Sequence, residues 1–133
     1  MQFNDVLFMV EDQDRGKWFP LLHPVTGEPA GMRFRVAGPD SRAQAKAMAI
    51  MTDELAEMAD ATGRVAGEDQ ARAQVQLLAR IVLDWDVTEG GEPLPLTFDR
   101  AVKLLSVAWV RAQVDAFAAS RRVYFEGEAD AAA

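Results

Sequence analysis

Residues 70–105, QARAQVQLLARIVLDWDVTEGGEPLPLTFDRAVKLL, decide the fold, because they contain a long helical pattern and the corner that follows it. Apolar side chains recur here at steps of three and four residues, which is the spacing of one helical face. Leu77 and Ile81 widen that face beyond a coiled-coil seam, so the helix should be largely buried. We therefore predict a central helix from about Glu68 to Trp85, with an inner face formed by Val75, Leu78, Val82 and Trp85.

A rigid corner follows this helix. Residues 89–93, EGGEP, end regular structure because glycine and proline interrupt both helices and strands. Thr97 then has the hydroxyl of a helix N-cap, and Asp99 places a negative charge in the first turn, where it suits the helix dipole. We expect one helix from Phe98 to about Val107 and another from about Ala108 to Arg122, or a single bent helix over both ranges. The stretch is a scaffold without obvious chemistry.

Composition and charge narrow the class of protein. The chain has 133 residues, enough for one domain that buries about two thirds of its unfolded surface. Half of the residues are hydrophobic, which excludes general disorder. The net charge of −7 argues against tracking of a phosphate backbone, so we expect protein partners and no nucleic acid. The absence of cysteine excludes disulfides, thiolate metal sites and cysteine nucleophiles.

The sequence predicts neither a secretory signal peptide nor a membrane span. The N-terminus, MQFNDVLFMVEDQ, lacks the basic start and long apolar run of a signal peptide. No apolar stretch approaches the ~20 residues of a membrane span. We therefore expect a cytoplasmic protein with no membrane partner.

The first 38 residues have the pattern of a small antiparallel sheet. Residues 5–10, DVLFMV, contain β-branched and aromatic side chains, and we predict a first strand there, followed by a turn. Residues 17–22 predict a second strand, which Pro20 confines to an edge or a bulge. In residues 32–36 apolar side chains alternate with two arginines, as in a half-buried strand with a charged outer face. Three short strands predict a β-meander that needs a helix packed on it.

The hydrophobic period then changes from two to 3.6 residues. A helix from about Ser41 to Thr62 follows a Gly-Pro turn, with Asp40 as its N-cap and Gly63 as its stop. Together with the later helices it predicts a mainly helical bundle of four to five helices.

The domain organisation follows from these elements. Residues 1–125 should form a single α+β domain, with a β-rich part at 1–38 and a helical part at 40–125. Residues 126–133 form an acidic, alanine-rich tail that has little to bury, and we expect it to be mobile.

No constellation of residues supports an enzyme or a metal centre. An acidic cluster begins at Asp84, but the glycine and glutamate positions of an EF-hand loop counted from there hold Glu89 and Pro95. His23 is the only histidine, and a zinc site would need carboxylates around that single imidazole, which is uncommon. No serine lies in a nucleophile elbow, and no phosphate-binding glycine pattern occurs. We predict no catalytic, cofactor-binding or metal-binding residue and no cofactor.

Adaptable apolar residues on the helices are the candidates for a binding surface. Methionine is frequent on surfaces that accept varied partners, and tryptophan is enriched at interface hot spots. The alternative is that the methionines of the helix at 41–62 pack on the N-terminal sheet. The candidate partner-binding residues are Met48, Met51, Leu55, Met58 and Trp109.

The order of several soft motifs carries a family resemblance. A Val-x-x-Trp-x-Val segment is followed by a Gly-Glu turn, two prolines, a threonine-capped helix with an Ala-x-x-Leu-Leu core and a Val-x-x-Phe ending. The matching residues are Val82, Trp85, Val87, Gly91, Glu92, Pro93, Pro95, Thr97, Ala101, Leu104, Leu105, Val114 and Phe117. The preceding strands and turn also match, at Trp18, Pro20, Thr26, Gly27, Glu28, Pro29, Phe34, Val36, Gly38 and Pro39. The chain thereby resembles the tail assembly chaperones of long-tailed phages and prophages.

The resemblance implies a role without catalysis. Such chaperones hold the long helical tape-measure protein soluble and help the tail tube protein polymerise around it, in the cytoplasm of the bacterial host. We expect the apolar side of a partner helix to bind the methionine, leucine and tryptophan surface, while negative charge keeps the complex soluble. Repeated binding along a long client would favour self-association.

Two alternatives remain open. The first alternative is another structural or adaptor protein of a phage particle, such as a head–tail connector or a tail completion protein. The second alternative is a small enzyme or a regulator that mimics DNA. A DNA mimic should array its carboxylates at phosphate spacing, whereas the acidic residues here are scattered among turns and helix faces.

Overall fold

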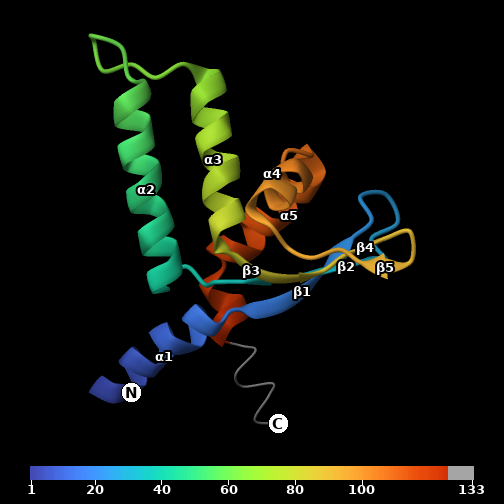
Figure 1. Cartoon of the computed structure of the whole chain (residues 1–133). Coiled ribbons are helices and arrows are strands. Elements are labelled where there is room, and N and C mark those ends of the chain that lie inside the picture. The colour runs from blue at the N-terminus through green and yellow to red at the C-terminus, as the bar shows by residue number, and fades with distance from the viewer. Residues whose placement is uncertain (126–133) are drawn as a thin grey trace.

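Helices and small antiparallel sheets make up the fold, and the α+β class is confirmed. The computed structural model describes residues 1–125, and the predicted mobile tail at 126–133 lies outside them. The elements in chain order are α1 (Phe3–Arg15), β1 (Lys17–Leu22), β2 (Pro29–Val36), α2 (Arg42–Met58), α3 (Gly67–Ile81), β3 (Val82–Asp86), β4 (Thr88–Glu89), β5 (Glu92–Pro93), α4 (Phe98–Leu105) and α5 (Ala108–Ala119), followed by a helical segment at 121–125. α2 and α3 stand side by side, and α1 points away from the body (Figure 1).

The first element is a helix, so the strand predicted at residues 5–10 is wrong. Asp5 lies in the first turn of α1, and its Oδ2 accepts the backbone N–H of Gln2 at 2.7 Å, which caps the helix. Arg15 places positive charge in the last turn, where it suits the dipole. As a helix the segment satisfies its own backbone hydrogen bonds without a neighbouring strand. The N-terminal order is therefore helix first and strands second.

The main sheet has three antiparallel strands in the order β1-β2-β3. β1 lies at an edge with an irregular register after Pro20, as that proline predicted. The third strand comes from far along the chain, so the meander of three consecutive N-terminal strands is wrong. The inner face packs against α5, where the rings of Phe19 and Phe117 stack with centroids 4.3 Å apart. Buried side chains of this face are Phe19, Leu21, Phe34, Val36 and Trp85.

The predicted central helix is shorter than expected. α3 ends at Ile81, and Val82–Asp86 pair with β2 as strand β3. The partners Arg35↔Asp84 and Val36↔Val82 leave Leu83 as an extra residue, which is a β-bulge. The bulge allows Val82 and Trp85, three residues apart, to be buried on the same side of a strand. That spacing also fits a helical face, which explains the wrong prediction.

The corner contains a small hairpin that the sequence analysis described only as a turn. β4 and β5 pair across Gly90 and Gly91, whose φ angles of 58° and 81° lie in the left-handed region that favours glycine. Trp85 joins β3 to the segment after the hairpin, because its Nε1–H donates to the carbonyl oxygen of Leu94 at 2.7 Å. Thr97 caps α4 by accepting the backbone N–H of Arg100, as predicted.

α2 packs along α3. Its N-cap is Ser41 and not Asp40, since the Ser41 hydroxyl accepts the N–H of Gln44 at 3.1 Å. Asp40 instead binds residues of α1 and the C-terminal segment. An ion pair of 3.0 Å between Glu54 and Arg80 joins α2 to α3. One hydrophobic cluster connects the inner face of the sheet with α3, α4 and α5.

Candidate binding surfaces

The predicted residues of α2 do not form one exposed surface. Met48 is half exposed, with 50% of its surface accessible. Met51 packs against the hydrophobic core, on the same helical face as the buried Ala47. Leu55 and Met58 are half-buried. The methionine-bearing face of α2 is therefore directed mainly toward α3, and neither toward the N-terminal sheet nor wholly to solvent.

Trp109 lies apart from these methionines. It occupies the first turn of α5 and is 38% exposed, with the exposed Val107 just before it. α3 stands between α2 and the pair formed by α4 and α5, and it packs against all three (Figure 1). The five predicted partner-binding residues are thus divided between two sides of the molecule, and their role stays a prediction.

Several exposed large apolar side chains gather on α1 and just before it, in a region that the sequence analysis assigned partly to a strand. Apolar side chains here remain open to solvent over the first two turns of the helix. The most exposed are Met1, Phe3, Val6, Leu7 and Phe8, with 79% of Phe3 and 58% of Phe8 accessible. Exposed apolar side chains gathered on one element mark an interaction surface more often than scattered ones do. Phe3, Leu7 and Val10 recur at steps of four and three residues, and this spacing in the sequence indicates an apolar helical face.

The other end of α1 is fixed to the body by a buried glutamine. The side chain of Gln13 is almost fully buried, and its Oε1 accepts the backbone N–H of Asp40 at 2.6 Å. Its Nε2 donates to Asp40 Oδ2 at 3.3 Å. A Cβ at Gly38 would lie 2.6 Å from this side chain, so only glycine leaves room for it. We call these three residues the α1 joint.

The C-terminal segment reinforces the α1 joint. Arg121 donates to both carboxylate oxygens of Asp40, at 2.9 and 3.0 Å. This hydrogen bond is the main reason that the pKa of Asp40 lies below its usual value, and the Gln13 side chain adds to it. The hydroxyl of Tyr124 donates to the carbonyl of Val36 at 2.6 Å, and burial raises its pKa. The C-terminal segment therefore lies against the base of α1 and the start of α2.

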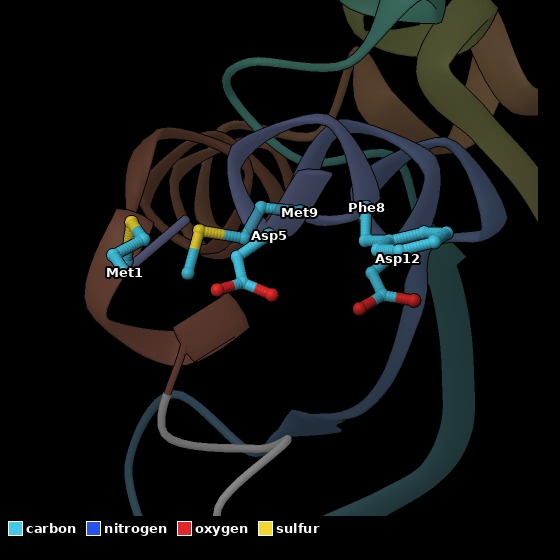
Figure 2. A pocket seen from close by; sticks show the side chains of 5 residues that line it. All are labelled: Met1, Asp5, Phe8, Met9 and Asp12. Carbon is cyan, nitrogen blue, oxygen red and sulfur yellow. The ribbon is translucent and has the colours of Figure 1, made fainter. Parts of the chain in front are cut away.

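One side of α1 forms an open groove. Met1, Asp5, Phe8, Met9 and Asp12 line it, and Figure 2 shows the carboxylates of Asp5 and Asp12 directed to the same side of the helix. The groove contains about 600 Å³ of open space. Asp12 pairs with Arg15, and Asp5 accepts the N–H of Gln2. The groove thus combines apolar side chains with two negative charges.

Within residues 1–125, no group of three or more acidic, histidine or cysteine side chains is placed to hold a metal ion. The helices of this part of the chain are too short or too polar to cross a membrane. His23 lies in a turn, where its Nδ1 accepts the N–H groups of Val25 and Thr26. Searches with family models, curated proteins and solved structures found no match to this chain.

Proposed function

We propose that this protein is a tail assembly chaperone of a long-tailed phage or prophage, which acts without catalysis. It binds the tape-measure protein and assists assembly of the tail tube around it. The observation that carries this proposal is the exposed apolar surface of helix α1, whose C-terminal end is fixed to the body by the α1 joint and whose first two turns expose Phe3, Leu7 and Phe8. Such an element is suited to binding the apolar side of another helix.

The residues behind the family resemblance support a scaffold that presents such a surface. Trp85 and Val87 are buried in the corner after α3, and Ala101, Leu105 and Val114 are buried in the helices that follow. Thr97 begins α4, and Gly91 forms the hairpin turn. These positions build the fold and contain no reacting group. The resemblance therefore favours a function that depends on shape and surface.

In the proposed mechanism, apolar contacts between client molecules are replaced by apolar contacts between the client and this chain. A long helical client exposes apolar side chains until the tube encloses it, and these would otherwise associate with one another. Burial of apolar surface stabilises a complex by about 25 cal/mol per Å² before the costs of association. The net charge of −7 on each bound copy makes the complexes repel one another. Several copies along one client would keep it soluble.

Co-expression with the candidate client, a tape-measure protein, tests the proposal. We expect the client to be soluble with the wild-type chain and to sediment as aggregate without it. The variant Met48→Ser tests the predicted surface on α2, because Met48 is its most exposed member. Equal aggregation with and without the wild-type chain would exclude the chaperone function. Retention of the chain as a ring in purified particles would instead indicate a connector or a tail completion protein.

A further inference from the structure

The free part of α1 is apolar on more than one side. Phe3, Val6 and Leu7 project from one face, while Met1, Phe8 and Met9 surround the groove on another. Exposed apolar side chains gathered on one element are typical of an interaction surface. Among the described residues, the body touches α1 chiefly at its C-terminal end, through the α1 joint and through Asp14, whose carboxylate accepts the backbone N–H of Arg42. Within residues 1–125, the apolar side chains of the first two turns stay exposed, as expected for a surface that binds a partner.

The charge of α1 indicates what kind of partner fits. The helix carries four acidic side chains and one arginine. Asp5 and Asp12 are seven residues apart, which places them two turns and about 10 Å apart on the same side of the helix. A carboxylate has about four acceptor positions, so each can accept further donors in addition to its present partner. Cations seven residues apart on another helix would match this spacing.

We propose that the groove of α1 is the docking site for an amphipathic helix of the client that carries lysine or arginine beside its apolar face. The partner's apolar side chains lie against Met1, Phe8 and Met9, and its two cations reach Asp5 and Asp12. This inference rests on the proposed function and names the site and the client chemistry. The α1 joint presents the groove in a fixed orientation, which lowers the entropic cost of binding.

A second copy of the chain fits this groove less well. Pairing of two α1 helices brings Asp5 and Asp12 of one copy against those of the other, and like charges across an interface are unfavourable. Among the described residues that line the groove, no side chain is positively charged, and Arg15, which pairs with Asp12, is not one of them. Any self-association of the chain therefore uses another surface.

Two synthetic helical peptides test the inference with the full-length protein. Both carry leucines on one face; the first has two lysines seven positions apart beside that face, and the second has glutamates in their place. We expect the lysine peptide to bind at least about tenfold more tightly by fluorescence anisotropy, with a preference that declines as salt increases. The double variant Asp5→Asn, Asp12→Asn should lose the preference.

Two phenylalanine variants locate the site. Phe8→Ala should weaken binding of the lysine peptide at least about tenfold, because it removes the largest apolar side chain of the groove. Phe98→Ala is the matched control, since Phe98 is also exposed but lies on α4. Equal binding of the two peptides, or full binding by Phe8→Ala, would overturn the inference. Oligomers of the wild type that dissociate in Phe8→Ala would also overturn it, because a second copy would then occupy the groove.

The outcomes separate this inference from the proposed function. A wild-type chain that keeps the tape-measure protein soluble while binding both peptides equally retains the chaperone function and loses the α1 docking site. A chain that discriminates between the peptides but does not hold the tape-measure protein retains the docking site and loses the proposed function.

Discussion

Replacement of Gln13 with alanine should loosen the base of α1. The substitution removes the two hydrogen bonds between the Gln13 side chain and Asp40, of 2.6 and 3.3 Å. Each such bond contributes about 1 kcal/mol net, and the N–H of Asp40 loses its acceptor in a partly buried place. We therefore expect the free energy of unfolding to fall by about 2 kcal/mol.

Urea denaturation followed by circular dichroism gives the free energy of unfolding of the variant. Hydrogen exchange of the α1 amides reports whether the helix detaches before the body unfolds. Gln70→Ala is the matched control, because the Gln70 side chain also donates a hydrogen bond, to the carbonyl of Val65, but in an exposed place at the start of α3. Water replaces that bond, so the control should change stability by less than about 0.5 kcal/mol. An equally small effect of Gln13→Ala, with unchanged exchange in α1, would refute the α1 joint.

Gln13→Glu adds a test of the charge at this position. A carboxylate here lies beside that of Asp40, and two like charges raise the pKa of the pair in the folded state. A raised folded-state pKa means that the native protein binds more protons, so the variant gains stability relative to wild type as pH falls. The deficit of Gln13→Glu should therefore be largest at neutral pH and smaller below about pH 5. A deficit that does not change with pH would contradict contact between the two side chains.

Three further predictions follow from single contacts. Arg121→Gln should be less stable than wild type above about pH 4, and the two proteins should become equally stable in more acidic solution. The reason is that Arg121 lowers the folded-state pKa of Asp40, and the stabilisation from this ion pair is lost as pH falls through the lowered pKa. Urea midpoints measured over a pH series test this prediction. Gly38→Ala should displace the Gln13 side chain and lower the free energy of unfolding about as much as Gln13→Ala does. Calorimetry measures the melting temperature, and an unchanged value would contradict this prediction. Trp85→Phe should cost about 1–2 kcal/mol in chemical denaturation, since it leaves a carbonyl of the corner without its donor; no loss would exclude that hydrogen bond.

Local signals in the sequence predicted the elements that depend on a few neighbouring residues. Pro20 cannot donate a hydrogen bond to a neighbouring strand, and β1 is indeed an edge strand. Thr97 has the hydroxyl that a helix start requires, and it caps α4. Trp85 was expected in the core and is buried there. In these cases the local chemistry and the tertiary structure favour the same conformation.

The errors arose where the pattern fitted two structures. Residues 5–10 form a short apolar run, and periodicity alone does not separate a strand from a helix in such a run. Val82 and Trp85 are three residues apart, which fits a helical face and also a strand with a bulge at Leu83. Pairing with β2, far away in the sequence, decided the second case. The residues around Val82 do not indicate that β2 will pair with them.

The candidate surfaces could be predicted only in part. Methionine content pointed to α2, but Met51 is turned toward α3 by packing that depends on two helices at once. The apolar surface of α1 was hidden by the strand assignment, because a strand in a sheet would have buried half of those side chains. The close approach of Arg121 and Gln13 to Asp40 joins residues from both ends of the chain, and no local pattern indicates it.

Hydrogen exchange at residues 3–10, measured with and without the client helix, tests most directly whether α1 binds it. Backbone amides in the free first turns of a helix exchange rapidly, and a helix docked in the groove should slow them. The account predicts at least about tenfold slower exchange there on addition of the client, and no such change in Phe8→Ala. Protection confined to α2 or α5, with α1 unchanged, would contradict it.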